Sequence, residues 1–450
     1  MTSTLIGRQA VVVGAGMAGL PAARALADHF EHVVVLERDA LPLESSQRAG
    51  TPQARHTHVL LAGGERALGQ LFGGFEQDLA GAGAVPIRVG LDVRLERPGY
   101  DPFPARDLGF AAHAMSRPLI EHTLRRRVTQ DAKIIIREHC RAREIISMPD
   151  DGAVSAIRFE NGDRRSETLP ADLVVEASGR ANVTSGFLES IGRPRPEVTI
   201  IGVDITYATA VFAVPDDAPT EWKGVMTFDS PAKGGVAAVM APLERNRWIV
   251  TLVGRHGDQP PADHAGFLAY ARQLRTPTIY DAIAGAEQLG EIARFGFPAS
   301  TRRHFEGLDD FPRGLLPLGD AFCRFNPVYG QGMSVAAQEA YLLRELLREC
   351  AGEADPLAGL ASPFFAEAAR LIDTPWALSA MPDLGDPKTE GPRPEDLRQR
   401  LEFSEALNHL AAQDAAVHKL LFEVLHLLKP RSALNDPDLV ERVNALAARA

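Results

Sequence analysis

The sequence predicts an α/β fold that is interrupted by an inserted antiparallel β-sheet and followed by a C-terminal helical region. The first forty residues show strand, glycine turn, helix and strand in "QAVVV", "GAGMAG", "LPAARALADHF" and "HVVVLE". Residues 198–255 then hold several β-rich segments without a helical pattern between them, and a strongly helical composition begins near residue 390. Consecutive strands after an α/β unit indicate a second sheet inserted into the first fold.

Length and composition exclude several classes of protein. The chain has 450 residues, 45% hydrophobic and 24% charged, which is typical of a soluble globular protein with two or three structural units. A net charge of −11 argues against nucleic acid or an acidic membrane surface as the main partner. Three scattered cysteines form neither a disulfide framework nor a zinc motif, and no apolar stretch reaches 18 residues. We therefore expect a cytoplasmic protein with no integral membrane span.

The glycine turn carries a dinucleotide-binding fingerprint. In "GAGMAG", Gly14 permits a tight turn, Gly16 lets backbone amides approach a pyrophosphate, and Gly19 lets the helix pack closely on the strand. Glu37 ends the second strand, 23 residues after Gly14, where an acid can accept hydrogen bonds from a ribose diol. The pattern predicts a site for the ADP part of a cofactor, with the helix N-terminus facing its phosphates.

A second motif decides between NAD and FAD, which share this fingerprint. A flavin extends past the pyrophosphate through a ribityl chain to its ring, so it needs further contacts. "GDAFCRFNPVYGQGMS" places Asp320 directly after a buried strand, turns the chain at Asn326 and Pro327, and exposes the backbone at Gly330 and Gly332. We predict that Asp320 accepts hydrogen bonds from ribityl hydroxyls and that the helix start faces the flavin ring.

Taken together, these motifs resemble those of the FAD-dependent monooxygenases of the para-hydroxybenzoate hydroxylase fold. Within that fold the chain is most similar to the bacterial branch of polyether-type epoxidases, relatives of squalene epoxidase. The segments that carry this resemblance are "RAGTPQARHTHVLL" (48–61), "GLLPLGDAFCRFNPVYGQGM" (314–333) and "DTPW" (373–376). The resemblance implies that Arg48 and Arg117 lie near the FAD phosphates or ribityl chain, a role that suits a guanidinium.

We therefore assign one non-covalently bound FAD to the chain. His56 and His58 lack a third ligand in a recognisable motif, so we interpret them as residues near the flavin and predict no metal site. The residues assigned to FAD binding are Gly14, Gly16, Met17, Ala18, Gly19, Glu37, Arg38, Arg48, His58, Arg117, Gly319, Asp320, Pro327, Gly330, Gln331, Gly332 and Met333.

The chain departs from related enzymes in two places. Hydroxylases of this fold carry an Asp-Gly pair after "DLVV", involved in FAD and NAD(P)H binding, whereas here Ser178 precedes Gly179 and Arg180. No second GxGxxG lies on a strand-to-helix turn, so the electron source is either NAD(P)H or a separate flavin reductase. The Trp-x-Trp motif of flavin-dependent halogenases is absent and no lysine precedes Lys133, which argues against halogenation.

The resemblance implies a reaction in which a flavin C4a-hydroperoxide passes one oxygen atom from O2 to a small organic substrate, by epoxidation or hydroxylation. The substrate is expected to be an alkene or aromatic natural product. No catalytic side chain is evident, and our pocket candidates are Phe297, Pro327 and Tyr329. Two alternatives remain: a reductase or dehydrogenase of the geranylgeranyl reductase type, and a non-catalytic flavin-binding protein.

These motifs and composition shifts divide the chain into three parts. A discontinuous Rossmann-like FAD-binding domain is expected over residues 1–85, 105–180 and 290–385. An inserted antiparallel β-sheet domain for the substrate takes 86–104 and 181–289, and the C-terminal helical region takes 386–450.

Overall fold

A computed structural model describes residues 5–448 apart from 151, 180–181 and 230–236. Its first sheet has five parallel strands in the order β16-β10-β1-β2-β6. The strands are β1 (Gly7–Val13), β2 (Phe30–Leu36), β6 (Ile134–Arg137), β10 (Leu173–Glu176) and β16 (Leu315–Pro317). Continuous apolar runs such as "AVVV" in β1 are buried on both faces, as expected for a central parallel sheet.

Alternate residues of this sheet face two different cores. Val12 and Val35 pack against a helical layer, whereas Val11 and Val34 face a three-stranded sheet and one helix on the other side. The helical layer contains α1 (Gly19–Ala27), α2 (Ala62–Leu71), α3 (Phe75–Gly81), α4 (Arg117–Val128) and α8 (Gly332–Cys350). The opposite layer contains β7 (Arg141–Ser147), β8 (Val154–Glu160), β9 (Ser166–Pro170) and α5 (Asn182–Ser190).

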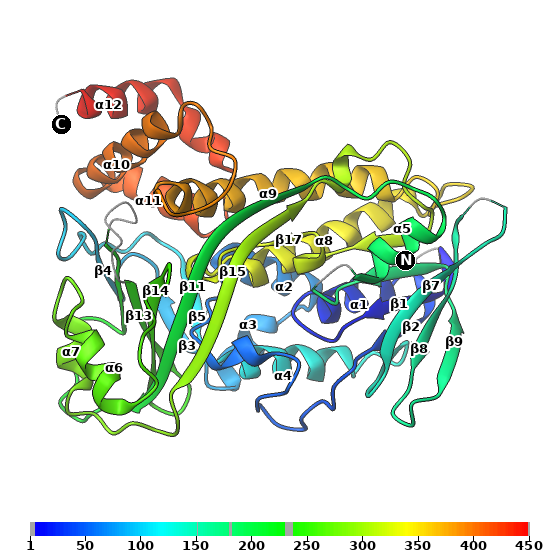
Figure 1. The fold of residues 1–450 in the computed structure, drawn as a ribbon, viewed down its shortest axis with the longest axis horizontal. Helices are drawn as coiled ribbons and strands as arrows, with labels where there is room; N and C mark the ends of the chain where they lie inside the picture. Colours follow the sequence, from blue (N-terminus) through cyan, green and yellow to red (C-terminus); the bar gives the residue numbers. More distant parts are fainter. Residues whose placement is uncertain (1–4, 151, 180–181, 230–236, 449–450) are drawn as a thin grey trace.

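The second sheet has seven strands, in the order β17-β15-β11-β14-β13-β12-β4. Its strands are β4 (Val93–Glu96), β11 (Val198–Ala213), β12 (Gly224–Thr227), β13 (Ala237–Leu243), β14 (Arg247–Arg255), β15 (Ala293–Arg303) and β17 (Cys323–Arg324). Neighbours are antiparallel except β4 and β12, which run parallel. The long strands β11 and β15 cross the molecule side by side toward the first sheet (Figure 1).

The two faces of the seven-stranded sheet are covered by different elements. One face, including Ala208 and Leu252, packs on α6 (His264–Ala271) and α7 (Thr278–Ile283). The other face, including Ile205 and Val253, packs with residues of α9 (Ala361–Leu384) and with Val328. This second face therefore packs against the segment that contains Val328 as well as against α9.

The C-terminal helices form a separate apolar cluster with Phe103. They are α10 (Leu397–Gln413), α11 (Ala415–Leu425) and α12 (Pro437–Ala447), drawn in orange to red in Figure 1. The remaining strands, β3 (Val85–Arg88) and β5 (Ala111–Ala114), pair with each other. Within the described residues, no helix is both long and apolar enough to cross a membrane.

The observed fold confirms the predicted class, an α/β domain with an inserted sheet and a C-terminal helical region. Two strands in the range 290–385, which is expected to belong to the FAD-binding domain, pair within the seven-stranded sheet. They are β15, which pairs with β11, and β17, which pairs with β15. The inserted sheet is also mixed rather than wholly antiparallel, because β4 arrives from before the insertion and pairs in parallel with β12.

Candidate active site

The glycine turn between β1 and α1 requires glycine for steric reasons. Gly14 has a φ of +103°, and a Cβ there would lie 2.8 Å from the carbonyl oxygen of Ala177. A Cβ at Gly19 would lie 1.8 Å from the carbonyl oxygen of Gly14, far inside van der Waals contact. The two positions therefore fix the tight turn and the close approach of helix to strand, as the fingerprint predicts.

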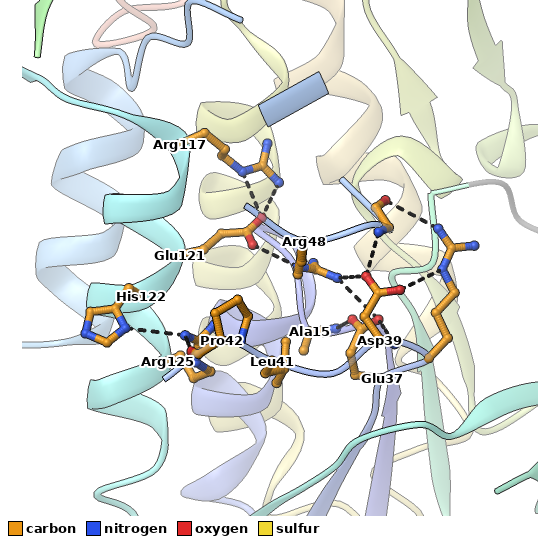
Figure 2. A network of polar contacts seen from close by, with 12 residues as sticks. Ala15, Glu37, Asp39, Leu41, Pro42, Arg48, Arg117, Glu121, His122 and Arg125 are labelled. Carbon is orange, nitrogen blue, oxygen red and sulfur yellow. Dashed lines mark hydrogen bonds and ion pairs between the residues drawn. The ribbon is translucent and has the colours of Figure 1, made fainter. Parts of the chain in front are cut away.

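Buried acids gather around Arg48 at the end of β2. The Arg48 guanidinium lies 3.3 Å from Glu37, 2.8 Å from Asp39 and 3.2 Å from Glu121, and Figure 2 shows it between these three carboxylates. Glu37 also accepts a hydrogen bond of 2.8 Å from the backbone amide of Ala15 in the glycine turn. Glu37, the acid predicted to bind a ribose, is therefore hydrogen-bonded to the turn that is predicted to bind the pyrophosphate.

Arg117 reaches the same turn from the first position of α4. Its guanidinium donates to the carboxylate of Glu121 at 2.8 Å and 2.7 Å (Figure 2). Burial alone would raise the pKa of Glu121, but the guanidiniums of Arg117 and Arg48 outweigh it and lower that pKa. A Cβ at Gly16 would stand 3.7 Å from Nη2 of Arg48 and 4.0 Å from Nη2 of Arg117. Two guanidiniums therefore converge beside the glycine that can bring backbone amides to a phosphate.

A hollow of about 420 Å³ opens just beyond the end of β2. Its lining includes Arg38, Asp39, Arg48 and His139. Arg48 and the backbone amide of Asp39 both contact Glu37, so the hollow lies beside the acid expected to bind the adenosine ribose.

Asp320 meets the glycine turn from the opposite side. A Cβ at Gly319 would lie 2.7 Å from Cβ of Ala18, so the segment after β16 touches the start of α1. The Asp320 side chain is exposed to solvent, but many protein atoms surround it and raise the pKa of its carboxyl. The guanidiniums of Arg324, Arg117 and Arg303 act in the opposite direction and lower that pKa. A Cβ at Gly332 would lie 3.8 Å from Oδ1 of Asp320. The carboxylate therefore lies beside the bare backbone at Gly332, and we call the region bounded by the glycine turn, Asp320 and the start of α8 the cofactor groove.

The N-termini of α1 and α8 both point bare amides toward this groove. Neither helix has a side-chain cap, and neither has an acid in its first turn. The residue before α8, Gln331, is buried, and its Oε1 has no hydrogen-bond partner within the described part of the chain. Uncapped helix starts favour anionic groups.

A buried network fixes the loop between β17 and α8. Asn326 donates to both carboxylate oxygens of Asp383 at 3.0 Å and 2.8 Å, and its own Oδ1 caps the backbone amide of Val328. The hydroxyl of Tyr329 donates to Asp383 at 3.1 Å, and the Arg255 guanidinium pairs with Asp383 at 2.9 Å. The loop is thereby tied to α9 and to β14 at once.

The two histidines of "RHTH" lie where the two sheets meet. His58 Nδ1 is 2.9 Å from the carbonyl oxygen of His56, and burial, with the charge of Arg117, lowers the pKa of His58 to about 3. Burial lowers the pKa of His56 to about 4. Both side chains are therefore neutral at pH 7. Among the described residues, a different group has ligand atoms close enough for a metal ion, Glu65, Glu76 and His113.

This arrangement fits FAD. Two guanidiniums and the uncapped α1 start would hold the phosphates, Glu37 the adenosine ribose, and Asp320 the ribityl hydroxyls. The bare start of α8 and the buried acceptor of Gln331 would face the ring. A family model described as "FAD binding domain" matches residues 8–360. The chain belongs to this FAD-binding family. It is an FAD-dependent oxidoreductase, as the sequence predicted.

Two related proteins are similar in sequence, and one of them is named a monooxygenase. The chain is 33% identical over 387 residues to Protein Rv3254 of Mycobacterium tuberculosis, covering 83% of this chain and 80% of that protein. It is 27% identical over 211 residues to "Monooxygenase cfoF" of Aspergillus candidus, covering 44% and 48%.

Solved structures share the fold. The p-nitrophenol 4-monooxygenase PnpA of Pseudomonas putida has a TM-score of 0.66 at 17% identity, covering 95% of this chain and 100% of that one. The flavin-dependent brominase Bmp2 has a TM-score of 0.67 at 13% identity, covering 98% of each chain. These identities establish a common architecture and no more.

Several of the predicted cofactor residues lie around the glycine turn, Asp320 and the start of α8, and their role in FAD binding stays a prediction. The structure also shows contacts that sequence reasoning missed. Among the pocket candidates, Phe297 is buried under the Arg324 guanidinium, 4.5 Å above its ring, while Tyr329 is engaged with Asp383 and Pro327 begins the turn before it. Ser178 donates to Glu176 at 2.7 Å, and Arg180 lies outside the described residues. The contacts of Asp383, Arg255 and Glu121 were not predicted, because they depend on pairing between distant segments.

Proposed function

We propose that the chain transfers one oxygen atom from O2 to an organic alkene or aromatic substrate, by epoxidation or hydroxylation. Flavin-dependent monooxygenation is the general activity that the family and its relatives support. The resemblance to polyether-type epoxidases favours an alkene. The observation that carries the proposal is the packing of the second sheet's mostly apolar face, with Ile205 and Phe297, against Val328 of the loop that we expect to face the flavin ring.

The roles of the protein follow from these contacts. When FAD is bound and reduced, it supplies the electrons that activate O2. The uncapped start of α8 would stabilise negative charge on the reduced ring, and the loop held by Asp383 would fix its position. The apolar sheet face would exclude water from the reacting atoms, so that the activated oxygen reaches the substrate instead of reacting with solvent.

The electron donor belongs to the same proposal. We infer that reducing equivalents come either from NAD(P)H at the flavin itself or from a separate flavin reductase. Ser178 supports the second route, since it stands where related hydroxylases carry an acid and is turned inward to Glu176. Non-covalent binding of FAD predicts that acid precipitation leaves a yellow supernatant.

The test is incorporation of labelled oxygen. The FAD-loaded protein is incubated under ¹⁸O2 with farnesol and with 1-naphthol, once with NADPH alone and once with an added flavin reductase. Mass spectrometry should show a product that has gained one ¹⁸O atom, and dependence on the reductase would identify the electron route. Loss or gain of two hydrogens without label would instead support a dehydrogenase or reductase.

A further inference from the structure

Within the described residues, Tyr207 of β11 and His56, which contacts Thr209 of the same strand, each have a buried polar atom without a protein partner. His56 is 3% exposed and Tyr207 is 5% exposed. Within the described residues, neither Nε2 of His56 nor the hydroxyl of Tyr207 makes a hydrogen bond. A buried polar atom without a partner costs about 1–3 kcal/mol, so a pair of them on one surface calls for an explanation.

The two side chains lie together in aromatic surroundings. The rings of His56 and Tyr207 are 5.8 Å apart, and the ring of Phe295 lies 5.6 Å from His56 and 6.4 Å from Tyr207. Phe295 is the direct partner of Tyr207 across β11 and β15, the two long strands visible in Figure 1. The unpartnered atoms therefore belong to one spot on the sheet, bordered by aromatic rings.

Two observations relate this spot to the cofactor groove. His56 is two residues before His58, and its carbonyl oxygen is hydrogen-bonded to the His58 ring. Burial and the nearby charge of Arg117 lower the pKa of His58. The charges of Arg255 and Asp383 act on the Tyr207 hydroxyl, and these two residues belong to the network that holds the loop before α8. The spot is therefore close to the network that holds the loop expected to face the flavin ring, and His56 is two residues from His58, which the charge of Arg117 reaches.

Three threonine hydroxyls form a hydrogen-bonded chain that ends at Nδ1 of His56. Nδ1 of His56 is 2.7 Å from Oγ1 of Thr209, which is 2.7 Å from Oγ1 of Thr251, and that oxygen is 2.8 Å from Oγ1 of Thr57. Thr209 and Thr251 are direct partners across β11 and β14. Each hydroxyl can donate in either direction, so the chain has two orientations. In one, Nε2 of His56 carries the proton and donates; in the other, Nδ1 carries it and Nε2 accepts.

We propose that Nε2 of His56 and the hydroxyl of Tyr207 together bind a neutral hydroxyl group of the substrate, and that the threonine chain sets whether His56 donates or accepts. This inference rests on the proposed monooxygenase function and narrows its substrate class to an apolar alcohol or phenol. A hydroxyl suits both orientations of the chain, since it can donate to one partner and accept from the other. A carboxylate suits the spot less well, because Asp383 already balances the nearby charge of Arg255.

The test compares two probes that differ by one hydroxyl. Binding of 1-naphthol and of naphthalene to the FAD-loaded protein is followed by the change in flavin absorbance, and cyclohexylmethanol against methylcyclohexane repeats the comparison for an alcohol. The hydroxylated probe should bind about tenfold more tightly. Tyr207→Phe and His56→Asn should each remove most of that difference and leave naphthalene binding unchanged. Asn retains a polar atom for Thr209 but has none at the position of Nε2.

A matched control separates binding from folding. Tyr270 of α6 packs against the opposite face of the same sheet, is 7% exposed, and its hydroxyl donates to Asp258 at 2.6 Å. Tyr270→Phe should lower the Tm and leave naphthol discrimination intact, whereas Tyr207→Phe should leave the Tm of the ligand-free protein unchanged or higher. Equal affinity for the two probes in the unaltered protein, failure of both to bind, or a drop in Tm for Tyr207→Phe equal to that of Tyr270→Phe would overturn the proposal.

The role of the threonine chain has its own readout. ¹⁵N NMR of labelled histidine reports which ring nitrogen of His56 carries the proton. Thr209→Val should change that tautomer population, and Thr209→Ser should restore it, because serine keeps the hydroxyl. Identical His56 spectra in all three proteins would show that the chain does not control His56, and would overturn that part of the inference. Labelled-oxygen incorporation tests the monooxygenase function separately, since it can fail while discrimination between the probes persists.

Discussion

The polar groups on the two sides of the candidate active site differ in whether they have hydrogen-bond or ion-pair partners. Around the glycine turn, Arg48 is surrounded by three carboxylates and Arg117 is paired with Glu121, so the charges are held in place before any ligand arrives. On the sheet face, His56 and Tyr207 each leave one buried polar atom without a partner in the described structure. The first arrangement organises a site for a large anionic cofactor, and the second leaves hydrogen-bonding capacity for a substrate.

The largest expected effect comes from the steric requirement at the turn. Gly19→Ala should destabilise the protein by about 3 kcal/mol or more and abolish FAD binding, because its Cβ would lie 1.8 Å from a carbonyl oxygen. Urea unfolding and flavin content measure the two effects. Gly69→Ala in α2 is the control, since no atom lies within 4 Å of the added Cβ, and it should gain about 0.5–1 kcal/mol. Equal effects of the two variants would contradict the steric argument.

Removal of Asp320 tests the cofactor side without disturbing the fold. Asp320→Ala should weaken FAD binding by ten- to a hundredfold, since about 1.5–3 kcal/mol is lost with a charged acceptor. Asp320→Asn should lose less, because it keeps one acceptor oxygen. Fluorescence titration of the apoprotein with FAD gives the dissociation constants, and the exposed Asp438 on α12 provides a neutral control as Asp438→Ala. A folded Asp320→Ala protein with unchanged affinity would show that Asp320 only shapes the turn.

A pH-dependent effect on stability is expected from Glu339, whose pKa the nearby charge of Asp320 helps to raise. Glu339 is fully buried and accepts a hydrogen bond of 2.6 Å from the amide of Gly319. Burial, with the charge of Asp320, raises the pKa of Glu339 to about 8. The folded protein therefore holds a proton that the unfolded chain releases near pH 4.5, so stability should fall as the pH rises from about 5 to 8, by up to about 1.4 kcal/mol per pH unit.

Glu339→Gln should remove this slope, because the amide oxygen still accepts from Gly319 and cannot ionise. Urea unfolding at pH 5, 6.5 and 8 measures it. If the variant and the unaltered protein lose stability in parallel over this range, Glu339 is not the group responsible.

The difference between the two sides also explains what sequence can predict. The glycine turn, Glu37 and Asp320 belong to short motifs whose chemistry is local, and the structure places them in one groove. The threonine chain joins residues 57, 209 and 251, and the Arg255–Asp383 pair spans 128 positions. These contacts depend on strand register and on the packing of α9, which no local pattern specifies. The alternation of Tyr207 and Thr209 with alanines in "ITYATA" indicated only that they share one face of a strand.

The most direct test measures FAD and 1-naphthol affinities side by side in Asp320→Ala and Tyr207→Phe. Asp320→Ala should weaken FAD binding ten- to a hundredfold and, once saturated with FAD, bind 1-naphthol as the unaltered protein does. Tyr207→Phe should bind FAD normally and lose about tenfold in 1-naphthol affinity. If Tyr207→Phe weakens FAD as strongly as Asp320→Ala, or if neither variant separates the two ligands, the division of this site into a cofactor side and a substrate side is wrong.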